Sequence, residues 1–162
     1  NDLSSLFDKY ITLFVIYNNL YNQIPNKLLS LGKVVPNKIY DNRMATVLVI
    51  QFLGADDFIN ELTSNNLEDD VNSIIRLMEQ EIFHIKLNHG QYDRNEDLKI
   101  ISELKSSNSI KKETAILKVL YYVRCNLFHS SKDFHEYQRM LVEPLTQILQ
   151  TLNPFLFGRL NA

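Results

Sequence analysis

The chain has 162 residues and a mass of 19.0 kDa, and we expect residues 1–162 to form one domain with a sizeable hydrophobic core. Hydrophobic residues make up 45% of the sequence, charged residues 22%, and the formal net charge is −2, which excludes a surface that is basic throughout and restricts any nucleic-acid site to a local patch. The single cysteine, Cys125, excludes an internal disulfide and a multi-cysteine metal site, and it favours a reducing, cytoplasmic setting.

The longest apolar stretch gives no sign of a membrane span. Residues 44–53 include Thr46 and Gln51, and the stretch is far shorter than the roughly 20 residues that a spanning helix needs. We therefore expect no membrane anchor. The chain begins with Asn1-Asp2 rather than with a cationic stretch and an apolar segment, which favours a processed or trimmed N-terminus over a signal peptide.

Glycine and proline are scarce, with 4 of each, and most lie between segments whose apolar residues have helical spacing. This distribution predicts an all-α fold rather than a β-sandwich. A long first helix is expected over residues 3–24, before Pro25. Its apolar face steps by alternating four and three through Leu3, Phe7, Tyr10, Phe14, Tyr17, Tyr21 and Ile24, and is widened by Leu6, Leu13 and Leu20.

Shorter helices are expected over residues 38–52, 55–62 and 96–104. Another is expected to begin at an Asn66 cap, with acidic residues in its first turn, and to end near His89-Gly90. The polar residues 91–97 are predicted to form a loop. The apolar positions of the helix after Asn66 are Val71, Ile74, Ile75, Met78, Ile82 and Ile85.

Residues 109–153 are predicted to form two helices joined by a turn at Ser130 or Ser131. The apolar stripe of the first also passes through Arg124. Its apolar members are Ile110, Leu117, Leu120, Tyr121, Leu127 and Phe128. Because an arginine is rarely buried alone, Arg124 requires a carboxylate, helix-end carbonyls, a subunit interface or a bound anion. The second helix is expected to be kinked or split by Pro144, with residues 155–157 packing back onto the bundle.

Residues 121–132 read Tyr-Tyr-Val-Arg-Cys-Asn-Leu-Phe-His-Ser-Ser-Lys. This string resembles the signature of the HEPN superfamily, in which four to six residues separate an arginine from a histidine near a helix end. Its residues are similar to the motif of the Apea-like and related prokaryotic branches. Here four residues separate Arg124 from His129. Two positions depart from the usual pattern. Cys125 follows the arginine, which leaves Asn126 as the neighbouring polar group, and Ser130 follows the histidine where glycine is frequent.

The resemblance implies a HEPN-like bundle of four to five main helices plus short helices, which commonly forms a homodimer with the two motifs facing each other. It implies, in many members, a metal-independent endoribonuclease that uses no cofactor and acts in prokaryotic toxin–antitoxin or antiphage defence. A toxin of this type needs restraint by a nucleotidyltransferase-like antitoxin or by an adjoining regulatory domain. RNA is therefore the expected substrate.

The chemistry expected of such a site is attack of a ribose 2′-hydroxyl on the adjacent phosphorus, which gives a 2′,3′-cyclic phosphate and a 5′-hydroxyl. His129 is suited to exchange a proton near neutral pH, and Arg124 to bind phosphate oxygens bidentately and stabilise charge in the transition state. Asn126 is expected to position the phosphate or the histidine. The expected substrate-binding residues are Asn126, Lys118, Lys132 and Tyr122, the last as a platform for a base.

Helix geometry constrains this pair. Five residues at roughly 100° each separate Arg124 and His129 by about 140°, so the two do not share one face of a continuous helix. Their convergence requires the helix to end near Phe128 or a second subunit to complete the site. Self-association is therefore a prediction of the catalytic interpretation.

The sequence also permits other interpretations. A thiolate nucleophile at Cys125 lacks a glycine-rich oxyanion turn. Glu81 and His84 have the Glu-x-x-His spacing of di-iron bundles, but no second copy occurs, so we expect no metal site and place His84, His89, Glu79 and Glu81 on the surface of the helix after Asn66. A non-catalytic helical module that binds a nucleotide, RNA or a partner protein in the same cleft is the alternative function, and a purely structural helical protein with Arg124 in an internal salt bridge is a third.

Overall fold

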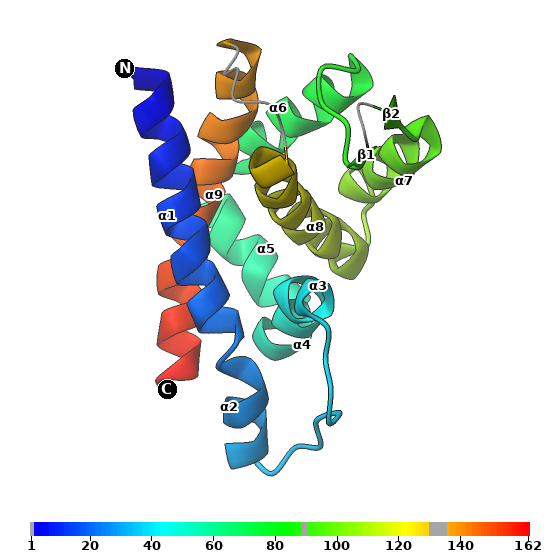
Figure 1. The fold of residues 1–162 in the computed structure, drawn as a ribbon. Coiled ribbons are helices and arrows are strands. Elements are labelled where there is room, and N and C mark those ends of the chain that lie inside the picture. The colour runs from blue at the N-terminus through cyan, green and yellow to red at the C-terminus, as the bar shows by residue number, and fades with distance from the viewer. Residues whose placement is uncertain (1, 89–90, 130–135) are drawn as a thin grey trace.

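The computed structural model describes residues 2–88, 91–129 and 136–162. Its regular structure in these ranges is almost entirely helical, which confirms the all-α prediction (Figure 1). The elements are α1 (Asp2–Tyr21), α2 (Ile24–Ser30), α3 (Asp41–Arg43), the π-helical turn η1 (Met44–Leu48), α4 (Val49–Leu53), α5 (Ala55–Ser64), α6 (Glu68–Glu79), β1 (Leu87–Asn88), β2 (Gln91–Tyr92), α7 (Arg94–Leu104), α8 (Ser109–His129) and α9 (Glu136–Leu160).

The first and last helices lie side by side and run in the same direction (Figure 1). The Asn153 side chain on α9 donates to the Leu13 carbonyl of α1 at 3.0 Å. Where this pair ends, Lys27 of α2 donates to the Ala162 carbonyl at 2.9 Å. The helices α5 to α8 pack on one side of the pair, so that α8 contacts α5, α7 and η1.

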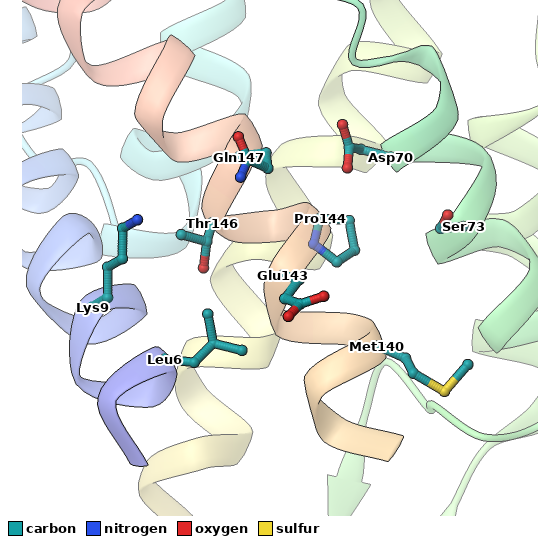
Figure 2. A pocket seen from close by; sticks show the side chains of 9 residues that line it. All are labelled: Leu6, Lys9, Asp70, Ser73, Met140, Glu143, Pro144, Thr146 and Gln147. Carbon is teal, nitrogen blue, oxygen red and sulfur yellow. The ribbon is translucent and has the colours of Figure 1, made fainter. Parts of the chain in front are cut away.

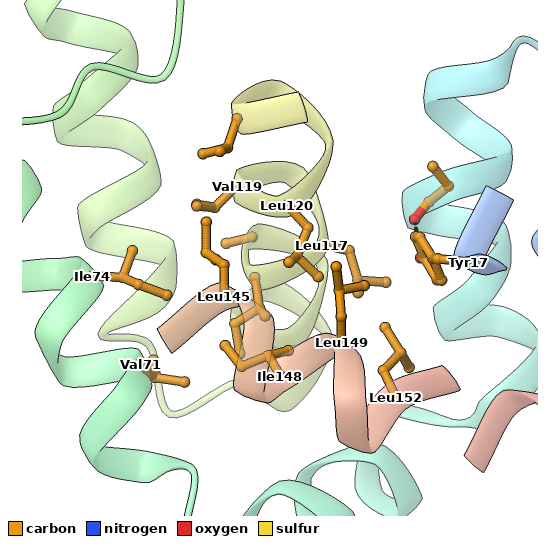
Figure 3. Close-up of a cluster of buried hydrophobic side chains, with 14 of the residues drawn as sticks. Tyr17, Val71, Ile74, Leu117, Val119, Leu120, Leu145, Ile148, Leu149 and Leu152 are labelled. Atoms are coloured by element: carbon orange, nitrogen blue, oxygen red, sulfur yellow. Dashed lines mark hydrogen bonds between the residues drawn. The ribbon is translucent and has the colours of Figure 1, made fainter. Parts of the chain in front are cut away.

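The apolar face predicted for the first helix forms part of one buried cluster. All seven residues named as its stepping positions are buried, and α6, α8 and α9 contribute the facing side chains (Figure 3). Ile110, predicted on the α8 stripe, is instead 62% exposed, because it lies in the first turn of α8, beyond the edge of this cluster. None of the described helices is long and apolar enough to cross a membrane.

Three predicted helix ends are wrong. The first helix ends at Tyr21, and Pro25 lies in the first turn of α2, where the missing N–H breaks no helical hydrogen bond. Asn66 does not cap α6, because it has a left-handed φ of 59° and Leu67 precedes the helix. The same helix ends at Glu79 rather than near His89-Gly90, and Glu81 with φ 58° turns the chain away. Asn adopts this conformation more readily than most residues.

The predicted loop over residues 91–97 contains a strand and a helix start. β1 and β2 pair antiparallel, with Leu87 opposite Tyr92. The Asp93 side chain then accepts a hydrogen bond from the Asn95 backbone at 2.9 Å, so α7 begins at Arg94.

The last helix is longer than predicted. α9 continues through Pro144 and Pro154 to Leu160 without being split, so residues 155–157 belong to the helix and do not form a separate tail. Of these three residues Leu156 is fully buried, Phe155 is half-buried and Phe157 is 58% exposed, so only part of the segment packs onto the bundle. The predicted turn at Ser130 or Ser131 lies outside the described residues.

Candidate active site

Arg124 lies on the side of α8 that faces α1. Its side chain is half-buried, and its guanidinium carbon lies 5.5 Å from the centre of the Phe14 ring, a cation–π contact. The prediction that the apolar stripe carries this arginine toward the core is therefore confirmed. Phe14 itself is 2% exposed, so the ring that the guanidinium contacts is buried.

Tyrosines and one carboxylate lie near this arginine. Asp41 of α3 accepts a hydrogen bond from the Tyr21 hydroxyl at 2.8 Å and from the Tyr121 hydroxyl at 3.2 Å. Burial, with a smaller contribution from Asp41, raises the pKa of Tyr121 to about 12, and the charge of Arg124 acts in the opposite direction. Burial likewise raises the pKa of Tyr21 well above its ordinary value, against the effect of Arg124. These tyrosines are therefore protonated donors near neutral pH.

A second face of α8 carries the predicted substrate-binding residues Lys118, Tyr122 and Asn126, which are all half-buried and are spaced four apart. The Tyr122 hydroxyl accepts a hydrogen bond from the Asn42 side chain at 3.1 Å, and Lys86 Nζ lies 5.8 Å from the centre of the Tyr122 ring. This face is therefore directed toward α3 and toward the segment that follows α6.

Asn126 contacts that same segment. Its side-chain amide donates long hydrogen bonds to the carbonyls of His84, at 3.4 Å, and Ile85, at 3.5 Å. The structure thus brings Asn126 and Tyr122 together on one face. It does not bring them to Arg124, which lies two residues from each along the helix and so about 200° around it.

The remaining predicted site residues are placed only in part. His129 is the last residue of α8, so the backbone stays helical from Arg124 to His129 and the predicted separation of about 140° applies to their α-carbons. The His129 side chain and the whole of Lys132 lie outside the described residues. Because both residues lie within α8, a site that uses Arg124 and His129 together is most simply completed by a second subunit.

The alternatives for Cys125, Glu81 and His84 are also located. Cys125 is a half-buried free thiol. Within residues 2–88, 91–129 and 136–162, no three His, Cys, Asp or Glu side chains are grouped as metal ligands. The prediction that His84 is a surface group of a helix is wrong, because it follows the end of α6 and its ring contacts the buried Asp97. Glu79 instead pairs with Lys105 at 2.7 Å.

A separate cavity of about 480 Å³ lies between α1, α6 and α9 (Figure 2). Lys9, Asp70 and Glu143 bring charges to it, and the Thr146 hydroxyl beside it is buried without a partner in the described chain. Burial, and then the charge of Asp69, raises the pKa of Asp70. None of the predicted site residues that the structure describes lines this cavity.

A comparison of the chain with protein families, with curated proteins and with solved structures finds no match. The functional assignment therefore has to come from the residues of α8 and from what surrounds them.

Proposed function

We propose that this protein is a metal-independent endoribonuclease of the HEPN type, active as a homodimer. The observation that carries the proposal is the Arg-x4-His string at the end of α8, with its arginine held half-buried against the aromatic side chains of α1. The planar guanidinium presents its donors in a fixed arrangement, and its packing against the buried Phe14 ring orders it further, so little conformational entropy is lost when it binds a phosphate. The predominantly helical architecture is consistent with this type of protein.

The proposed reaction assigns a role to each group. Arg124 binds the scissile phosphate and stabilises the charge that develops on its oxygens. His129 exchanges the proton that the transesterification requires. Tyr122 and Lys118 line the approach of the RNA strand, together with Lys132, and Asn126 holds the neighbouring segment of backbone in place. The products are a 2′,3′-cyclic phosphate and a 5′-hydroxyl.

The biological setting belongs to the same proposal. A ribonuclease of this type acts in the cytoplasm, in a toxin–antitoxin or antiphage defence system. A nucleotidyltransferase-like antitoxin or an adjoining regulatory domain restrains it. DNA is spared, because it has no 2′-hydroxyl to act as the nucleophile.

The test is incubation of the purified chain with mixed tRNA and mRNA in excess EDTA, followed by end-group analysis of the fragments. We expect cleavage by the wild-type protein, and a loss of about 100-fold or more in Arg124→Ala and His129→Ala. Arg124→Lys keeps the charge but not the bidentate geometry, so we expect it to remain strongly impaired. Arg76→Ala, at an exposed arginine on α6, is the matched control and should leave cleavage unchanged.

Two outcomes would contradict the proposal. Full activity in both Arg124→Ala and His129→Ala would remove these residues from the reaction. A folded wild-type dimer that binds RNA in a fluorescence anisotropy assay but never cleaves it would favour the alternative, a non-catalytic binding module. Circular dichroism of each variant separates loss of chemistry from loss of fold.

A further inference from the structure

The segment between α6 and α7 contributes a histidine–aspartate pair outside the Arg-x4-His string. His84 Nδ1 lies 2.6 Å from Oδ2 of Asp97. The Asp97 side chain is fully buried on α7, and its second oxygen accepts a hydrogen bond from the Ile85 backbone at 2.8 Å. Arg94 Nη1 lies 3.6 Å from Oδ2 and offsets its charge. The carboxylate is therefore fixed in position.

This arrangement orients the imidazole. A carboxylate accepts hydrogen bonds, so Nδ1 carries a hydrogen, and in the neutral imidazole the lone pair is on Nε2. The Tyr92 ring covers one face of the imidazole, with ring centres 3.5 Å apart and planes tilted by 13°. The side chain is still 13% exposed, and Nε2 takes no hydrogen bond from the part of the chain that the structure describes.

The pair lies beside the second face of α8. Asn126 contacts the carbonyls of His84 and Ile85, and it lies one helical turn before His129. Lys86, two residues after His84, places its ammonium group over the Tyr122 ring. The oriented imidazole, a cation and the aromatic platform thus belong to one patch of the surface next to the end of α8.

We propose that His84 is the proton acceptor in the RNA cleavage proposed above, and the inference rests on that function. His84 Nε2 takes the proton of the 2′-hydroxyl as the O2′–P bond forms. The P–O5′ bond breaks, and the leaving oxygen receives a proton from the protonated imidazole of His129. Both histidines then return to their starting forms by proton exchange with water. A pair that only fastened the segment to α7 would need the Nδ1 contact but not the free Nε2 nitrogen.

The decisive variant is His84→Asn. The asparagine amide can donate to Asp97 from nearly the position of Nδ1, so the contact with α7 is kept while the basic nitrogen is lost. We expect kcat for RNA cleavage to fall about 100-fold or more with little change in KM, and the unfolding midpoint to stay within a few degrees of the wild type. His89→Asn replaces a histidine to which no role is assigned, and it should cleave normally.

An activated substrate separates the two histidines. Uridine 3′-p-nitrophenyl phosphate has a leaving group that departs without a proton, so its cleavage needs the base but not the acid. His129→Ala should therefore be strongly impaired on RNA and largely restored on this substrate. His84→Asn should be impaired on both.

The outcomes distinguish the inference from the function beneath it. If His84→Asn cleaves both substrates normally while His129→Ala fails on RNA, His84 is not the base, although the ribonuclease assignment stands. If restoration on the activated substrate is seen in His84→Asn instead of His129→Ala, the roles of the two histidines are reversed and the inference is wrong. If the wild-type protein cleaves neither substrate, both proposals fail.

Discussion

Glu113 illustrates how one side chain can set the pH response of the fold. It lies in the first turns of α8, is fully buried, and neither carboxyl oxygen has a hydrogen-bond partner in the described ranges of the chain. Burial is the main cause that raises its pKa to about 8; the charge of Glu68 acts in the same direction, and that of Lys112 lowers it. At neutral pH the folded protein therefore holds this group mainly as the uncharged acid.

The raised pKa predicts that stability falls as the pH rises. Below the ordinary glutamate pKa of 4.5 the carboxyl is protonated in both the folded and the unfolded chain, so it causes no change of stability with pH. Above that value the unfolded chain releases the proton while the folded chain keeps it, so the free energy of unfolding decreases until about pH 8 and then levels off. The expected loss between pH 5 and pH 8 is about 3–4 kcal/mol, measured by urea unfolding at pH 5, 6.5 and 8.

The Glu113→Gln variant removes the titrating group with little change of shape. Its stability should vary much less over this pH range, so that it exceeds the wild type at pH 8. Glu143→Gln, at an exposed position on α9, is the control and should retain the wild-type pH response. Parallel curves for the wild type and Glu113→Gln would show that Glu113 is not the group responsible.

The residues of the candidate site were predictable to different extents. Arg124 could be placed on the core-facing stripe because its neighbours three and four positions away are apolar. Its contact with Phe14, and the bonds of Tyr21 and Tyr121 to Asp41, join segments far apart in the sequence, and no local pattern gives them. The proximity of His84 and Asp97 was missed for the same reason, although the Glu-x-x-His spacing had singled out His84 as a residue with possible chemistry.

At the scale of elements, periodicity predicted burial better than it predicted helix ends. The face of α1 was predicted correctly because one side of a long helix must meet the core over many turns. The end of α6 depended on Glu81 adopting a left-handed conformation, which local spacing does not encode. Pro25 and Pro144 misled in the same way, since each was expected to interrupt a helix; Pro25 instead lies in the first turn of α2, and α9 continues through Pro144.

The π-helical turn η1 shows how a buried tyrosine supports an irregular element. A π turn interrupts the regular ladder of backbone hydrogen bonds, so the groups at its edges need other partners. The Tyr17 hydroxyl, which is fully buried, donates to the Ala45 carbonyl within η1. The Thr46 hydroxyl donates to the Asn42 carbonyl at 2.7 Å. The η1 turn directly follows α3 and so positions it. Asn42 and Asp41 of α3 contact α8.

Replacing Tyr17 with phenylalanine should therefore destabilise the fold. The ring keeps its packing, but the Ala45 carbonyl loses its donor in a place that water does not reach. We expect a loss of about 1–2 kcal/mol in the free energy of unfolding, measured by urea denaturation. Tyr40→Phe, at a side chain that is 72% exposed, should change stability by less than about 0.5 kcal/mol. An equal effect of the two substitutions would rule out a structural role for the Tyr17 hydroxyl.

At the scale of the whole molecule, the packing around α8 separates the groups that the proposed reaction needs. Arg124 faces α1, whereas Tyr122 and Asn126 face α3 and the segment after α6. Because α8 remains helical to His129, the α-carbons of Arg124 and His129 lie about 140° apart around one helix. A homodimer that places two copies of α8 against each other would let the arginine of one copy meet the histidine of the other.

This arrangement predicts complementation between two inactive variants. Arg124→Ala and His129→Ala, mixed in equal amounts and allowed to exchange subunits, should give about one half heterodimers. Each heterodimer has one composite site with both residues intact and one with neither, so the mixture should regain about a quarter of the wild-type activity. Differently tagged chains, purified through both tags, isolate the heterodimer, which should have about half the wild-type activity.

If Arg124 and His129 of the same chain formed the site, every site in the heterodimer would lack one residue. Purified heterodimer without activity would therefore contradict a site shared between subunits, and would place both residues in a site formed by one chain.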